Sequence, residues 1–191
     1  KQDLNTRYSR RNFVLDRLLE MIIEQEETNF DRKSKKSLNP YDTVVGYGRL
    51  LKPGDKDPVR GTPTANKPIS KMTFAEVKEF GRALVNASKG KVGQGATKGS
   101  SAVGAFQLLA NNYNTNNPIV ENLQKRLGYK DSDIFNEEAQ KTLAKALIVD
   151  IARDELSTYL EEPSKRNATI LITRIGKMVI QIQGKQMDGM E

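Results

Sequence analysis

Cysteine, histidine and tryptophan are all absent from this chain of 191 residues. Their absence excludes disulfide bonds, zinc sites built from Cys and His, and the thiol and Ser-His-Asp nucleophile systems. An enzyme of this composition is therefore expected to work through carboxylates, with no metal and no cofactor. Long apolar runs are also missing. No stretch reaches the roughly 18 apolar residues that a membrane-spanning helix needs, so no membrane span is expected.

Basic residues outnumber acidic ones, because 31 Lys and Arg stand against 24 Asp and Glu, a net charge of +7. Part of the excess comes from Lys33, Lys35 and Lys36 and from the Lys89–Lys98 loop. A basic surface concentrates anionic partners, which are either carboxylate-bearing polymers or nucleic-acid phosphates. The chain shows no basic motif interleaved with aromatic residues and no nucleic-acid fold signature, so nucleic acid is the less favoured partner.

The spacing of apolar residues predicts a mainly α chain with a small β element. Helices are expected over residues 11–27, from Thr73 with a capping box to Glu76, over 102–109 or beyond, between Pro118 and Gly128, and from Asn136 to about residue 160. A short hairpin is expected in the β-prone run 41–48, within a long loop. The tail, residues 168–184, mixes helical and strand-like spacing, so its state stays open. One domain is expected at 11–160, with a β-containing lobe at about 40–70 and extensions at 1–10 and 161–191.

The end of the first predicted helix carries four glutamates, and one of them falls on the apolar face. On a helical wheel with Leu15 at zero, Glu26 lies at about 20°, within the apolar stripe. Glu20, Glu24 and Glu27 lie at about 140°, 180° and 120°, on the polar side. A carboxyl among apolar neighbours is desolvated, which raises its pKa toward the range of a general acid. Glu26 is therefore the candidate catalytic residue. The alternative is that the helix ends before residue 26 and the side chain faces water.

Three sequence blocks then occur in an order that belongs to a known family. They are Glu26-Glu27-Thr28, the run YDTVVG from Tyr41, and the run SSAVGAFQLL that ends at Leu109. Together they resemble the lambda-type phage lysozymes, which are lytic transglycosylases of the lysozyme superfamily, over roughly residues 13–150. The resemblance implies an α+β lysozyme-like fold, with a helical lobe, a small β-hairpin lobe and a cleft between them.

The resemblance also implies a set of site residues. Glu26 would end the first helix as the catalytic acid and base, and the residues that bind the sugar would line both sides of the cleft: Tyr41, Asp42, Ser101, Phe106 and Gln107. The implied substrate is the MurNAc-GlcNAc β-1,4 bond of peptidoglycan, cleaved with closure of a 1,6-anhydro ring on the muramoyl unit. The expected partners are glycan strands and other phage virion proteins, in the virion or in the host periplasm and cell wall.

Hydrolysis is the main alternative chemistry. A conventional glycosidase needs two carboxylates, about 5–5.5 Å apart for retention or 6.5–9.5 Å for inversion. The positions where T4-type phage hydrolases carry Asp and Thr hold Lys35 and Tyr41 in this chain. Asp42 remains the candidate second carboxylate. Its alternative role is that of a loop aspartate that accepts hydrogen bonds from backbone amides.

Further alternatives remain open from the residues alone. Phe106 also fits a core position, whereas Gln107 needs hydrogen-bond partners if it is buried, and a sugar would supply them. Glu27 and Ala105 depart from the family, which commonly has Gly and Arg at these positions. These departures also fit a virion or tail component that keeps the lysozyme-like fold with weak or lost activity.

Overall fold

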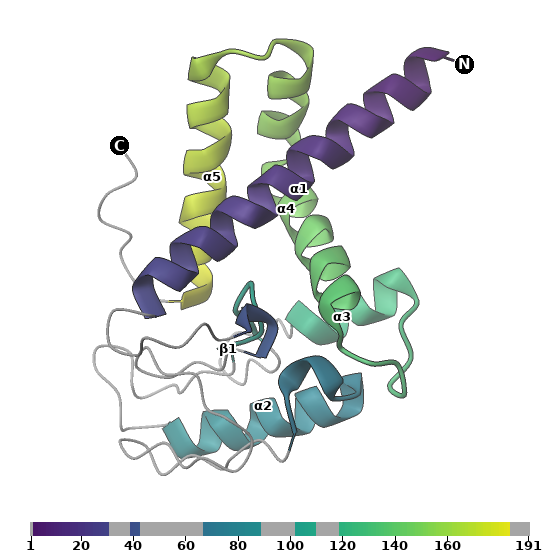
Figure 1. The fold of residues 1–191 in the computed structure, drawn as a ribbon, viewed down its shortest axis with the longest axis vertical. Helices are drawn as coiled ribbons and strands as arrows, with labels where there is room; N and C mark the ends of the chain where they lie inside the picture. Colours follow the sequence, from purple (N-terminus) through teal and green to yellow (C-terminus); the bar gives the residue numbers. More distant parts are fainter. Residues whose placement is uncertain (1, 31–38, 43–66, 89–101, 110–118, 184–191) are drawn as a thin grey trace.

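The computed structural model describes residues 2–30, 39–42, 67–88, 102–109 and 119–183 (Figure 1). Within these residues the α-helices are α1 (Gln2–Phe30), α2 (Phe74–Ser88), α3 (Ile119–Leu127), α4 (Glu137–Glu161) and α5 (Lys165–Gln183). Two 3-10 helices, η1 (Pro40–Asp42) and η2 (Ile69–Lys71), and a hairpin of β1 (Ala102–Val103) and β2 (Leu108–Leu109) complete the described part. The prediction of a mainly α chain with a small β element is confirmed.

α4 is the central helix, because α1, α3 and α5 all pack against it. It begins at the predicted position and is capped there, since Asn136 Oδ1 accepts a hydrogen bond from the backbone N–H of Ala139 at 2.9 Å. α4 bends at Ala152, where φ is −117° and ψ is 31°. At this bend the carbonyl of Ile151 accepts a hydrogen bond from Arg174 Nε of α5 at 3.1 Å, which ties the two helices together. The inward face of α4 is apolar and buried at Leu143, Leu147, Ile148 and Leu156.

α1 is longer than predicted, because it begins at Gln2 rather than at residue 11 and continues to Phe30. Residues 5–10 are exposed and carry no apolar stripe, so the spacing of apolar residues could not reveal that they are helical. A helix extends easily into such residues once a packed segment has formed, since each added residue gains a hydrogen bond without a new nucleation step. That packed segment is the apolar stripe, which is buried at Leu15, Leu18 and Leu19.

Residues 102–109 form the hairpin, so the prediction of a helix over this range is wrong. The two strands pair antiparallel, with Val103 opposite Leu108. The turn closes with a hydrogen bond from the backbone N–H of Gln107 to the carbonyl of Gly104 at 3.2 Å. Gly104 has a φ of 79° and Gln107 a φ of 49°, and these left-handed conformations interrupt a helix. Short apolar runs look alike in strands and helices, which is why the spacing of apolar residues predicted a helix here.

The predicted start of α2 and the predicted bounds of α3 agree with the structure. Thr73 Oγ1 accepts from the backbone N–H of Glu76 at 3.2 Å, and Glu76 Oε1 accepts from the backbone N–H of Thr73 at 3.3 Å, which is the expected capping box. α3 ends before Gly128, whose φ of 78° is the left-handed conformation that glycine adopts without a Cβ clash.

The tail is helical rather than extended. α5 begins after Ser164, whose Oγ accepts a hydrogen bond from the backbone N–H of Asn167 at 3.1 Å. Leu171 and Ile175 of α5 are buried in the same apolar cluster as the stripe of α1. α5 therefore belongs to the packed fold through Leu171 and Ile175. The β-prone residues 43–48 and most of the predicted β lobe lie outside the described residues. Of the helices that are described, none is long and apolar enough to cross a membrane.

Candidate active site

Glu26 lies inside α1, four residues before the end of the helix. The helix thus continues past this position, against the alternative in which it ends earlier. The last described turns of the apolar stripe reach Ile22, which packs against the core cluster that also contains Tyr41 and Phe106. The side chain of Glu26 lies outside the described part of the chain, and so does all of Ser101.

Tyr41 of η1 is buried beside Phe106, which belongs to the hairpin. Its side chain is 7% exposed, and the two rings meet edge to face with their centroids 6.1 Å apart. Burial raises the pKa of the Tyr41 hydroxyl; Lys141 opposes this rise, while Glu137 adds to it. Lys141 and Glu137 of α4 therefore both influence the pKa of the Tyr41 hydroxyl. Tyr41 and Phe106 form one aromatic pair that joins η1 to the hairpin.

Asp42 joins η1 to η2. Its Oδ1 accepts a hydrogen bond from the backbone N–H of Ser70 at 2.9 Å. The side chain is half-buried, and η1 itself is closed by a bond from the Asp42 N–H to the Asn39 carbonyl at 3.0 Å. This contact corresponds to the alternative role in which Asp42 binds a backbone amide. The two short helices that flank residues 43–66 are thus fixed to each other.

Gln107 has a protein partner within its own turn. Its side chain is 2% exposed, and Nε2 donates to the carbonyl of Gly104 at 2.8 Å. The same carbonyl accepts the backbone N–H of Gln107, so one oxygen receives both bonds. Phe106 is 7% exposed, which is a core position. In the described structure Gln107 closes the hairpin turn, and Phe106 packs the turn into the core.

Gln140 of α4 connects these segments, although the sequence did not single it out. Its side chain is 1% exposed, and its Oε1 accepts from the backbone N–H of Ala105 at 3.0 Å. Its Nε2 donates to the carbonyls of Tyr41 and Phe135, each at 3.1 Å. One amide therefore binds the hairpin, η1 and the segment before α4. The signal that could have found Gln140 is its helical position, because it lies three and four residues before Leu143 and Ala144 and so shares the apolar face of its helix.

Gly104 is required at this junction for two reasons. Its φ of 79° disfavours any residue with a Cβ, and a Cβ built there would overlap Oε1 of Gln140. The hairpin backbone therefore approaches the Gln140 amide more closely than an alanine would allow. Figure 1 shows the resulting arrangement, with η1 next to the hairpin and both of them at the end of α4 where that helix begins.

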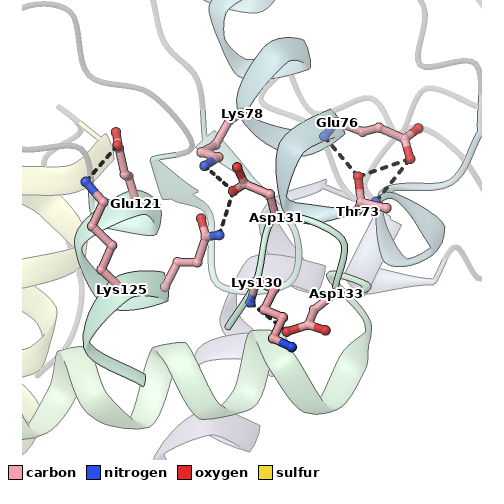
Figure 2. Close-up of polar contacts among 9 residues, drawn as sticks. Thr73, Glu76, Lys78, Glu121, Lys125, Lys130, Asp131 and Asp133 are labelled. Atoms are coloured by element: carbon pink, nitrogen blue, oxygen red, sulfur yellow. Dashed lines mark hydrogen bonds and ion pairs between the residues drawn. The ribbon is translucent and has the colours of Figure 1, made fainter. Parts of the chain in front are cut away.

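A second polar cluster fixes α2 to the segment that follows α3 (Figure 2). Asp131 accepts hydrogen bonds from Lys78 Nζ at 2.7 Å and from Gln124 Nε2 at 2.8 Å. The bond from Lys78, followed by that from Gln124, lowers the pKa of the Asp131 carboxyl. At the start of α2, a hydrogen bond from Lys67, followed by that from the Thr73 backbone, lowers the pKa of Glu76. Both carboxylates are structural, because their partners are protein groups.

The predicted residues that the structure describes thus come together around Gln140: Tyr41, Asp42, Phe106 and Gln107. Over the same described ranges, no group of three or more Asp and Glu side chains is placed to hold a metal ion. No protein-family model, curated protein or solved structure matches this chain.

Proposed function

We propose that this protein is a lytic transglycosylase that cleaves the MurNAc-GlcNAc β-1,4 bond of peptidoglycan and leaves a 1,6-anhydro-muramoyl end. The proposal rests first on the resemblance to the lambda-type phage lysozymes. The single structural observation that carries it is the junction at Gln140. Two blocks that the resemblance places at the cleft, 41–42 and 106–107, are neighbours there in one packed unit, in contact with each other rather than across a gap.

The position of Glu26 supports the assignment of the catalytic acid and base. Residues four apart share a face of an α-helix, so position 26 continues the row of Ile22, which packs against the core cluster that holds Tyr41 and Phe106. We infer that a carboxyl in this row contacts less water than one on the polar face of the helix, which favours its protonated form. Such a group is suited to give a proton to a glycosidic oxygen.

One carboxyl suffices for the proposed reaction. The protonated Glu26 donates its proton to the oxygen that leaves with the GlcNAc unit, and the bond from that oxygen to C1 of the muramoyl unit breaks. The Glu26 carboxylate then accepts the proton of the C6 hydroxyl of the same muramoyl unit, while that oxygen bonds to C1. The glutamate returns to its protonated form, and no water is consumed. The second product carries the anhydro ring.

The contact of Asp42 supports this chemistry over hydrolysis. A retaining or inverting hydrolase needs a second carboxylate that faces the sugar. Asp42 Oδ1 is already hydrogen-bonded to the backbone of Ser70 at 2.9 Å, which suits an anchor of the lobe better than a nucleophile. The net charge of +7 also suits a wall polymer that carries carboxylates.

The deciding experiment compares Glu26→Gln with Glu20→Gln on purified peptidoglycan, with mass analysis of the released fragments. Glu26→Gln should abolish release while the thermal midpoint stays nearly unchanged, because the amide keeps the shape of the carboxyl and cannot deliver a proton. Glu20 is the matched control. It lies on the polar face in an exposed ion pair with Arg17, and its replacement should leave release intact.

The products then identify the reaction. Anhydro-muramoyl ends are the expected result. Reducing muramic ends would instead indicate a hydrolase that uses Asp42 as its second carboxylate. Full activity of Glu26→Gln would show that the site is misassigned. An absence of any product from the unsubstituted chain would favour the alternative of a virion component without activity.

A further inference from the structure

A groove opens between the first turns of α1 and the last turn of α4. It has a volume of about 530 Å³, within the range of sites that hold small ligands. Figure 1 shows this region where α1 begins and α4 turns into α5, at the opposite end of the view from α2 and the hairpin. The groove is therefore separate from the candidate active site.

The lining of the groove is strongly basic. Arg7, Arg10 and Arg11 of α1 face it, and Glu161 is the one carboxylate among its lining residues. Arg10 is held in place, because its Nη2 donates to the carbonyl of Leu160 at 3.1 Å. Within the described part of the chain, neither Arg7 nor Arg11 forms an ion pair. Arginine has a planar fork of donors that matches a carboxylate in two parallel hydrogen bonds, so the groove is suited to an anionic ligand.

An aromatic ring accompanies the arginines. Tyr8 lies two helical turns before Leu15, on the face of α1 that is buried further along, yet its side chain is 65% exposed within the groove. An exposed flat ring of this kind offers a surface on which the apolar face of a sugar ring packs, and its hydroxyl reaches the sugar's polar edge. The groove thus combines a stacking surface with carboxylate-binding forks.

From these features we propose that the groove is a second peptidoglycan-binding site, with a sugar ring on Tyr8 and a stem-peptide carboxylate on Arg7 and Arg11. The choice of ligand rests on the proposed function, since peptidoglycan is the polymer that joins sugar rings to peptide carboxylates. The site holds the enzyme on the intact wall and takes no part in bond cleavage. It adds affinity for the polymer, because two linked binding sites act together on one strand network.

The test measures retention on insoluble peptidoglycan sacculi in a Glu26→Gln background, so that the wall is not digested. Tyr8→Ala and the double variant Arg7→Ala/Arg11→Ala should each weaken binding by about tenfold. Phe13→Ala is the matched control for the ring. It is 74% exposed on the same helix but does not line the groove.

The double variant Arg153→Ala/Arg166→Ala is the matched control for charge, since both side chains are exposed and lie outside the groove. Both controls should bind within about twofold of the parent. On sacculi stripped of stem peptides, the Arg7/Arg11 effect should vanish while the Tyr8 effect persists. Equal losses in groove and control variants would overturn the proposal. So would a loss of oligothymidylate binding by the groove variants without a loss of sacculus binding, which would identify a nucleic-acid site.

Failure of this inference and failure of the proposed function give different results. Tyr8→Ala in the chain with Glu26 intact should cleave short soluble muropeptides at the parental rate, because such fragments occupy only the cleft. If that chain cleaves these fragments and the groove variants keep full sacculus binding, the groove proposal alone is wrong. If the parental chain cleaves nothing and sacculus binding still depends on Tyr8, the proposed activity alone is wrong.

Discussion

Replacement of Gln140 by leucine tests the junction on which the candidate site depends. Leucine has nearly the same volume, but it leaves three buried backbone groups without partners, on Ala105, Tyr41 and Phe135. An unsatisfied buried group costs about 1–3 kcal/mol, and partial relaxation lowers the sum, so we expect a loss of about 3–5 kcal/mol in unfolding free energy. For a chain of this size that loss lowers the thermal midpoint by roughly 6–20 °C.

The matched control is Gln124→Leu, because Gln124 is also a helical glutamine and is 4% exposed. Its Nε2 makes one bond to Asp131, and its Oε1 is buried without a hydrogen-bond partner among the described residues. Asp131 keeps its bond to Lys78, so this replacement should cost less than about 1 kcal/mol. Urea unfolding followed by far-ultraviolet circular dichroism measures both variants. If Gln140→Leu is no more destabilising than Gln124→Leu, the junction does not hold the segments together.

Two further predictions concern the same contacts. Gly104→Ala should destabilise the fold by about 2 kcal/mol or more. In a Gln140→Ala background, where the overlapping amide is gone, the same substitution should cost at least about 1 kcal/mol less. If the two losses of stability simply add, the proposed overlap is contradicted. Asp131 has a pKa below its ordinary value because of Lys78, so its contribution is complete above about pH 4 and is lost as the pH falls through the lowered pKa. The stability difference between the parent and Lys78→Met should therefore shrink below that pH, and a difference that stays constant down to pH 2 would refute the assignment.

Local chemistry made much of the helical framework predictable. Capping boxes and caps act over three residues, so Thr73 with Glu76 and Asn136 with Ala139 can be read directly from the sequence. The apolar stripe of α1 is local in the same sense, because its period follows from helix geometry alone. The exposed first turns of α1 carry no such pattern, and the prediction therefore began the helix too late.

The junction could not be predicted in the same way. The partners of Gln140 lie 35 residues away at Ala105 and 99 residues away at Tyr41, and no local pattern records such contacts. The hairpin was missed for a related reason. Its left-handed position at Gly104 lies against the side chain of Gln140, a contact that is remote in the sequence, whereas the apolar run by itself fits a helix equally well. Tertiary contacts therefore decide the conformation here.

α1 connects the two proposed sites. Tyr8 and Glu26 are 18 positions apart, which is five helical turns, so they share a face of the helix at a separation of about 27 Å along its axis. The turns between them are anchored in the core at Leu15 and Leu19, so the two ends are joined by packed helix. At that distance neither substitution perturbs the other site directly. Tyr8→Ala is therefore expected to lose retention on the intact wall and keep cleavage of short fragments, whereas Glu26→Gln is expected to keep retention and lose cleavage.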